Sequence, residues 1–135
     1  MSYPITDFED IDADEAKALK SLGIRTTEKL LEAAKSPKGR NVLAAKTQLD
    51  ARRVLRWANI ADKLRIKGMG VGYARLLCEV GVDTVKELRY RNPAKLAKSI
   101  VEINRKRKLV RVLPSEKLVA RWVEYARKLP QKITY

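Results

Sequence analysis

Two glycines near the middle of the chain flank one apolar residue and precede a helical pattern. The segment runs Ile66-Lys67-Gly68-Met69-Gly70-Val71-Gly72, and Ala74 and Leu77 follow it. Glycine adopts left-handed backbone angles that other residues avoid, so we expect Gly68 and Gly70 to turn successive N–H groups outward. Outward N–H groups beside the positive end of a helix form a concave site for an anion. The predicted chemistry is therefore the binding of a phosphate group.

Charge is unevenly distributed along the chain. Its 30 Lys and Arg residues and 16 Asp and Glu residues give a net charge of +14, yet residues 1–16 contain six acids and no base. Many bases follow the glycine segment: Arg89, Arg91, Lys95, Lys98, Arg105, Lys106, Arg107, Lys108 and Arg111. Such a cluster beside a phosphate site indicates a nucleic-acid interface. The alternative is a solvated helix surface.

Apolar residues recur at helical spacing along most of the chain, as in Leu96, Ile100 and Ile103, and no alternating strand pattern is present. We therefore predict an all-α fold. Thr84 and Glu87 form the pattern of a capping box, so a short helix is expected to start there. Pro93 and Pro114 mark further helix starts, Gly23 and Gly81 mark helix ends, and residues 49–64 are expected to form one long helix, with a break near Asn59 as the alternative.

The first half of the chain repeats this pattern in a weaker form. A shift of 58 residues places Phe8 on Ile66 and Gly23 on Gly81, and a shift of 65 places Trp57 on Trp122. We predict an internal duplication with copies at residues 1–64 and 65–135. A copy of about 60 residues has a marginal core, so the two copies are expected to form one compact pseudo-twofold domain. Residues 130–135 are expected to be a loose end.

The first copy carries acids where the second carries glycines. Asp10 and Asp12 correspond to Gly68 and Gly70, and Glu9, Asp14 and Glu15 surround them. These carboxylates would repel a phosphate, and aspartate suits turns and helix N-caps, so we expect a structural role. The functional alternatives are a contact for a basic protein partner, an internal cover for the basic face, and a weak divalent-cation site.

The glycine segment resembles the hairpin of helix-hairpin-helix proteins. The pattern of an apolar residue, any residue, Gly, an apolar residue, Gly, three residues, Ala, two residues and Leu is matched throughout residues 66–77. Residues 80–84 are similar to the joint that follows in that family. The whole chain resembles a tandem helix-hairpin-helix protein of a bacterial domain family of unknown function, and each copy is similar to the C-terminal domain of the RNA polymerase alpha subunit.

This resemblance implies binding to the backbone of double-stranded DNA, across the minor groove and without base recognition. On this chain it assigns the phosphate contacts to main-chain N–H groups of Gly68, Met69, Gly70 and Gly72, with Lys67 and Arg75 as charged supports. It also implies a potassium or sodium ion at the carbonyl groups of residues 67–69. One competent hairpin is expected to bind weakly, so the basic residues must supply the remaining affinity. RNA, including ribosomal RNA, and a protein-interaction module are the alternative functions.

Several other classes of function are not expected. The chain contains no histidine, which excludes histidine bases and histidine metal sites, so we expect no enzyme activity, catalytic residue, cofactor or resident metal. No apolar run approaches about 18 residues and the start lacks the pattern of a signal peptide, so we expect no membrane span and a cytoplasmic protein, near the nucleoid if it binds DNA.

The thiol and the tryptophans are expected to be structural. Cys78, the one cysteine, is predicted to be a core or half-buried thiol. Trp57 and Trp122 are predicted to anchor the core of their copies. The basic run of residues 105–108 contains no aromatic residue, so a platform for stacking single strands is not expected.

Overall fold

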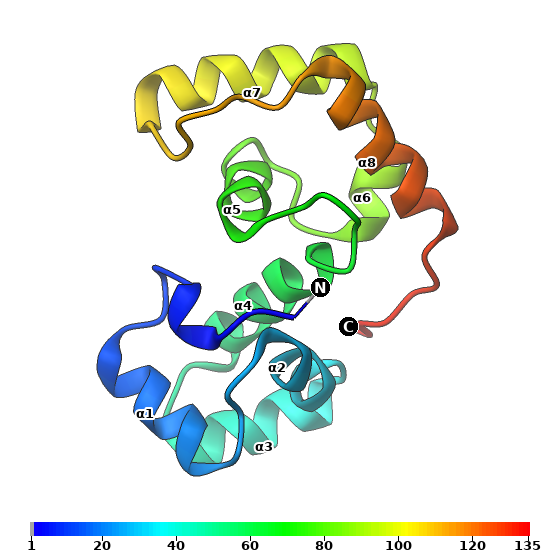
Figure 1. Ribbon diagram of the computed structural model, residues 1–135. Coiled ribbons are helices and arrows are strands. Elements are labelled where there is room, and N and C mark those ends of the chain that lie inside the picture. The colour runs from blue at the N-terminus through cyan, green and yellow to red at the C-terminus, as the bar shows by residue number, and fades with distance from the viewer. Residues whose placement is uncertain (1) are drawn as a thin grey trace. The chain divides into compact units, whose positions relative to one another are not determined.

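The computed structural model describes residues 2–135, which form helices joined by short loops (Figure 1). A 3-10 helix, η1 (Ile5–Asp7), comes first. The α-helices are α1 (Ala13–Ser21), α2 (Thr27–Ala34), α3 (Pro37–Thr47), α4 (Ala51–Lys63), α5 (Val71–Glu79), α6 (Val85–Arg89), α7 (Pro93–Arg107) and α8 (Glu116–Lys128). The described residues contain no strand beyond an isolated bridge between Pro4 and Thr26. The all-α prediction is confirmed.

The chain divides into two compact units. Unit 1 comprises residues 1–62 and 132–135, and unit 2 comprises residues 63–131. The long helix expected over residues 49–64 is α4, which starts at Ala51 and continues through Asn59 without a break. Asp50 begins α4 by accepting a hydrogen bond from the Arg52 N–H at 2.8 Å.

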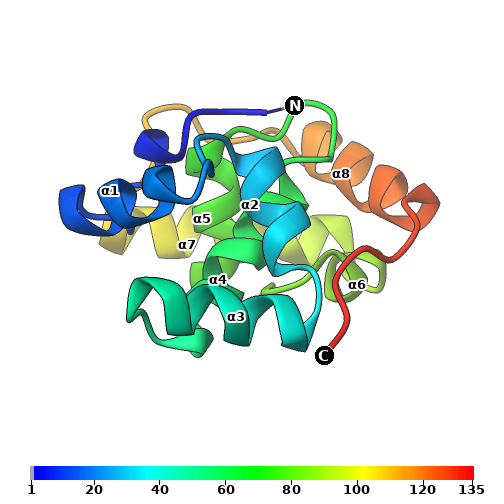
Figure 2. The ribbon, with the colours of Figure 1, turned by 90° about the horizontal axis from the view of Figure 1, so that it is seen from below.

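Unit 1 has its core among η1 and helices α1 to α4. The apolar faces bring Phe8, Leu19, Leu30 and Trp57 to at most 1% exposure, and α2 packs on α3 while α1 contacts α3 and η1 (Figure 2). Trp57 is fully buried, which confirms its predicted role as a core anchor.

The last four residues belong to unit 1, contrary to the expected loose end. Ile133 is 2% exposed, the Thr134 N–H donates to the Lys35 carbonyl at 2.8 Å, and the Arg40 guanidinium donates to the Thr134 carbonyl at 2.8 Å. The Tyr135 hydroxyl donates to the Asn59 side chain at 2.8 Å. The prediction was wrong because one apolar residue and these polar contacts order a segment of unremarkable composition.

In unit 2, α8 packs on α6 and α7, and α5 packs on α7 (Figure 1). The buried faces meet at Trp122, Leu77, Leu88 and Leu96, none of which is exposed. Trp122 is thus also a core anchor, as predicted. Cys78 is half-buried, as predicted, and its Sγ lies 3.0 Å from the ammonium group of the fully buried Lys63.

Helix starts and ends follow the sequence signals closely. The Thr84 hydroxyl accepts from the Glu87 N–H at 3.0 Å and starts α6, but the Glu87 carboxylate contacts the Asp83 N–H at 3.4 Å. The expected capping box is therefore half formed. Gly23 and Gly81 have φ values of 80° and 90° just after α1 and α5, which confirms both as helix ends.

The two units share local hydrogen bonds at the offset of 58 residues. The Ile11 N–H donates to the Phe8 carbonyl at 3.1 Å, and the Met69 N–H donates to the Ile66 carbonyl at the same distance. Equivalent bonds close the turns after α1 and α5. These bonds agree with the expected register, while the duplication and its pseudo-twofold arrangement stay predictions.

Candidate nucleic-acid interface

The hairpin before α5 combines one left-handed glycine with one extended glycine. Gly68 has φ +83°, as expected, whereas Gly70 has φ −94° and ψ 172°, which any residue can adopt. The expectation of left-handed angles at both glycines was therefore wrong for Gly70. Met69 lies between them with 1% exposure, and its N–H is bonded to the Ile66 carbonyl, so this group is not available to a phosphate.

Gly70 is the N-cap of α5 and leaves the start of that helix open. A glycine cap has no side-chain oxygen, so none accepts from the first turn. In contrast, each of the seven other α-helices among residues 2–135 begins at a residue whose side-chain oxygen accepts a hydrogen bond from a main-chain N–H. These residues are Asp12, Thr26, Ser36, Asp50, Thr84, Asn92 and Ser115. Within residues 2–135, the N–H groups of Gly70, Val71 and Gly72 have no protein acceptor. Unsatisfied donors at a helix N-terminus attract anions.

Nothing inside unit 2 requires a glycine at position 70. A Cβ added there meets no atom within 4 Å, whereas a Cβ at Gly72 would lie 3.3 Å from the Val110 side chain. Because the backbone angles of Gly70 are also ordinary, a larger residue would fit at this position, and the glycine leaves open space outside the helix end.

The loop between α7 and α8 forms the other wall of this opening. A hollow of about 300 Å³ is lined by Gly70, Gly72, Tyr73 and residues 110–112, which include the exposed Arg111. The Tyr73 hydroxyl donates to the Val112 carbonyl at 2.9 Å. The Asn104 side chain bonds both the N–H and the carbonyl of Val110 at 3.0 Å. Arg111 is therefore held between two anchored residues beside the start of α5.

The corresponding hairpin of unit 1 is closed by its own side chains. The Asp12 carboxylate accepts from the Glu15 N–H at 2.8 Å, and Glu15 accepts from the Asp12 N–H at 3.0 Å, which is a complete capping box. Arg53 of α4 donates to Glu15 at 2.5 and 2.8 Å and to the Asp10 carbonyl at 2.5 Å. This hydrogen bond from Arg53 holds the pKa of Glu15 below its ordinary value of 4.5, against the opposing effect of burial. The predicted role of Asp12 as a cap is confirmed.

Some of the basic residues predicted for the interface have partners within unit 2. Arg89 donates to the carbonyls of Ala126, at 2.8 Å, and of Leu129, at the end of α8. Arg107 pairs with Glu79 at 3.1 Å. Arg89 therefore acts as a cap for α8, and the charge of Arg107 is compensated.

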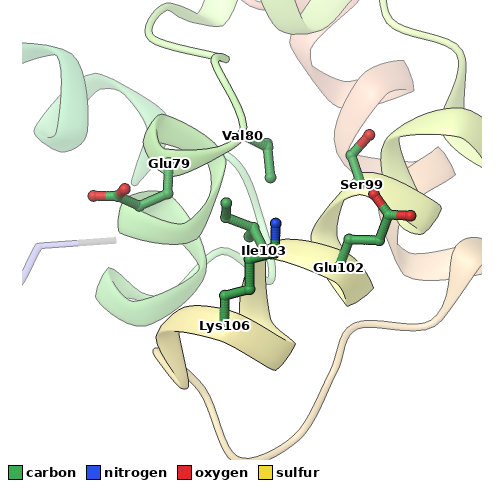
Figure 3. A pocket seen from close by; sticks show the side chains of 6 residues that line it. All are labelled: Glu79, Val80, Ser99, Glu102, Ile103 and Lys106. Carbon is green, nitrogen blue, oxygen red and sulfur yellow. The ribbon is translucent and has the colours of Figure 1, made fainter.

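Lys106 lines a separate pocket between the end of α5 and α7, with a volume of about 280 Å³ (Figure 3). Glu79 and Glu102 line the same pocket, together with Ser99, Val80 and Ile103. The lining carries two carboxylates and a single ammonium group, which does not suit a phosphate, so this pocket lies outside the candidate interface.

The remaining predicted residues lie at the surface of unit 2. Lys67 is exposed in the hairpin and Arg75 is half-buried on α5. Arg91 is half-buried before α7, Lys95, Lys98 and Arg105 are exposed on α7, and Lys108 is its exposed C-cap with φ 51°. The hollow beside α5 joins only Gly70, Gly72 and Arg111 of the predicted set.

Sequence reasoning missed three residues of α8 that lie next to the hairpin. Arg121, Tyr125 and Lys128 line a cavity of about 410 Å³ together with Lys67 and Gly68. They do not form a run in the sequence. Their spacing of four and three residues places them on one side of a helix, and that periodicity was the signal that could have found them.

The net charge is concentrated in unit 2. Its eighteen bases and six acids give +12, whereas the twelve bases and ten acids of unit 1 give +2.

Among residues 2–135, no cluster of His, Cys, Asp or Glu is arranged to hold a metal ion, which leaves the divalent-cation alternative at the acidic hairpin without support. None of the described helices has both the length and the apolar character needed to cross a membrane.

Comparison with known proteins identifies a family and no individual relative. No curated protein and no solved structure matches the chain. Residues 9–129 match a family described as "Domain of unknown function (DUF4332)". This match spans unit 2 up to Leu129 and most of unit 1. The chain therefore belongs to the DUF4332 family.

Proposed function

We propose that this protein is a non-enzymatic nucleic-acid-binding protein that grips the backbone of double-stranded DNA at the start of α5. The observation that carries the proposal is the uncapped N-terminus of α5, where Gly70 leaves the first N–H groups open in a chain that caps its other α-helices. An incoming phosphate oxygen would accept from these N–H groups, as in unit 1 the Asp12 carboxylate accepts from the Glu15 N–H in the first turn of α1.

Charge around the site supports the same ligand. Arg111 lines the hollow at the open helix end, Lys67 is exposed three residues before Gly70, and unit 2 has a net charge of +12. A helix terminus alone contributes roughly 0.3–1 kcal/mol to binding an anion, so it selects the position of a phosphate more than it supplies affinity. Most of the affinity must come from several Lys and Arg contacts along the backbone.

The contacts proposed here recognise phosphates and carry no information about sequence. Main-chain N–H groups cannot distinguish bases when they bind phosphate oxygens, so binding should tolerate any duplex sequence. The resemblance of residues 66–77 to helix-hairpin-helix proteins favours the DNA minor groove and a cytoplasmic protein near the nucleoid. A docking site for a basic protein at the acidic hairpin is less favoured, because Arg53 and Arg56 already pair with Glu15 and Asp10 there.

Two measurements test this proposal. Fluorescence anisotropy with labelled duplex DNA, single-stranded DNA and duplex RNA at several salt concentrations should show preferred binding to duplex DNA. With four to six phosphates neutralised, log K should fall with log salt with a slope of about −4 to −5. In a titration followed by amide NMR, Gly70, Val71 and Gly72 should shift, while the equivalent residues 12–14 should not. Equal binding to all three ligands, or shifts at residues 12–14 instead, would refute the site.

A further inference from the structure

A second concave surface of unit 2 includes Gly68 in its lining. It is a cavity of about 410 Å³ lined by Lys67, Gly68, Leu118, Arg121, Glu124, Tyr125 and Lys128, all within unit 2. Its volume is in the range of small-molecule sites. We call it the α8 groove.

The groove follows one stripe of α8. Leu118, Arg121, Tyr125 and Lys128 recur at intervals of three and four residues, while Val119, Trp122 and Ala126 face the core. The stripe therefore places an aromatic ring, 39% exposed for Tyr125 as a whole, between two cationic groups. Glu124 is the one acid of the groove, and its carboxylate contacts Arg127 at 3.4 Å.

A buried polar group without a hydrogen-bond partner among residues 2–135 lies close to Gly68, behind the lining of the groove. A Cβ at Gly68 would lie 3.6 Å from Leu118 and 4.0 Å from the Trp122 Nε1, so the indole N–H lies under the hairpin. Trp122 is fully buried, and its Nε1 has no hydrogen-bond partner among residues 2–135. Any side chain at position 68 would approach Leu118 and the indole of Trp122.

In unit 1, the arginine that corresponds to Arg121 pairs with a carboxylate of the chain itself. The alignment of Trp57 with Trp122 places Arg56 at the position of Arg121, and the alignment of the hairpins places Asp10 at that of Gly68. Arg56 pairs with the Asp10 carboxylate at 3.4 Å. Arg121 has no such partner among the described residues, because glycine replaces the aspartate. The exposed Arg121 is therefore available to an anionic ligand.

The two units also differ at the position of Tyr125. Ile60 of unit 1 corresponds to Tyr125 and is 1% exposed, so that position belongs to the core. In unit 2 the tyrosine is at the surface between Arg121 and Lys128. A ligand for this groove must therefore combine a negative charge with a flat surface that stacks on an aromatic ring.

We infer that the α8 groove takes an unpaired nucleotide, with its phosphate on Arg121 and Lys128 and its base on Tyr125. A nucleotide provides both features, and aromatic stacking on bases is independent of sequence. This inference rests on the proposed function, because the unpaired nucleotide continues the strand whose duplex part lies at α5. The protein would accordingly favour a junction between duplex and single strand over a blunt duplex.

The test compares four labelled DNAs with the same duplex: one with a blunt end, two with a short single-stranded overhang of opposite polarity, and one with an overhang of abasic nucleotides. The wild type should bind one overhang at least about fivefold more tightly than the blunt duplex, the factor that corresponds to roughly 1 kcal/mol of stacking. The abasic overhang should lose most of that gain. Tyr125→Ala should abolish the preference and retain the blunt-duplex affinity.

Tyr90→Ala is the matched control, because Tyr90 is 80% exposed and lies outside the groove. Thermal unfolding of both variants shows whether each is folded. Equal affinity of the wild type for blunt and overhang duplexes would overturn the inference and leave the proposed function standing. A preference that persists in Tyr125→Ala would overturn it too.

A separate arm distinguishes failure of the two proposals. If no duplex binds, a single-stranded oligonucleotide is titrated while tyrosine and tryptophan fluorescence is followed. Quenching that Tyr125→Ala reduces at least about fivefold in apparent affinity would support the groove without the duplex site. Absence of such quenching would overturn the groove as well.

Discussion

The Nε of Arg53 lies 2.5 Å from the Oε2 of Glu15, although the two residues are 38 positions apart in the chain. The Glu15 side chain is only 10% exposed and also completes the capping box with Asp12. This ion pair thus joins α4 to the start of α1 and compensates the charge of Glu15. The hairpin of unit 2 lacks these acids, and the predicted shift of 65 residues places Leu118 at the position of Arg53.

Glu15 should make the stability of the protein sensitive to acid. Its folded-state pKa is lowered, chiefly by the hydrogen bond from Arg53, so its contribution is fully present above the unfolded pKa of about 4.5 and is lost as the pH falls through the folded pKa. Urea unfolding across pH should show the free energy of unfolding falling below about pH 4.5. Glu15→Gln should flatten that fall and cost about 1–2 kcal/mol at neutral pH, whereas Glu102→Gln, at an exposed residue in the middle of α7, should change neither.

The two hairpin glycines should respond differently to alanine. Gly68→Ala places a side chain at φ +83° and should cost about 1–2 kcal/mol of stability. The backbone angles of Gly70 are ordinary and the space around it is open. The stability of the Gly70→Ala variant should therefore stay within about 0.5 kcal/mol of the wild type. Chemical denaturation measures both, and a comparable loss in the two variants would contradict the structural distinction.

Two arginines predicted together for the interface should separate into different roles. Arg89→Ala removes donors to the last carbonyls of α8 and should lower the free energy of unfolding by about 1–2 kcal/mol. Arg111→Ala should leave stability unchanged and reduce the salt slope of DNA binding by about one. Denaturation and anisotropy on both variants decide this, and the reverse assignment would show that Arg89 contacts DNA.

The carboxyl-terminal segment should contribute to the stability of unit 1. Ile133→Ala removes a side chain that is 2% exposed and should cost about 2–5 kcal/mol. Val112→Ala, at a residue that is 72% exposed, is the control and should cost little. If thermal unfolding of Ile133→Ala matches the wild type, the contacts of this segment are not maintained in solution.

Local signals in the sequence predicted most of the secondary structure. Caps such as Thr84 and Asn92, and the turn glycines 23 and 81, act within a few residues, so a single sequence contains the information that determines them. The buried tryptophans were likewise predictable from the apolar stripes around them.

The features that sequence reasoning missed depend on contacts between distant residues. The sequence alone does not distinguish Arg89 from the exposed surface bases, because its hydrogen bonds go to the end of α8, about 40 positions away. The docking of Ile133 needs Lys35 and Arg40, nearly a hundred positions away. Arg121, Tyr125 and Lys128 line a cavity only because Lys67 and Gly68 of the hairpin lie beside α8.

The most direct test of the phosphate site is duplex-DNA affinity, measured by anisotropy for Gly70→Asp and Gly70→Ser beside the wild type. Either side chain can cap α5 and should keep or slightly raise the unfolding temperature, as Asp12 caps α1. The aspartate places a negative charge where the phosphate would lie, so it should reduce affinity at least about tenfold, with a smaller loss for the neutral serine. Wild-type affinity in folded Gly70→Asp would contradict the account.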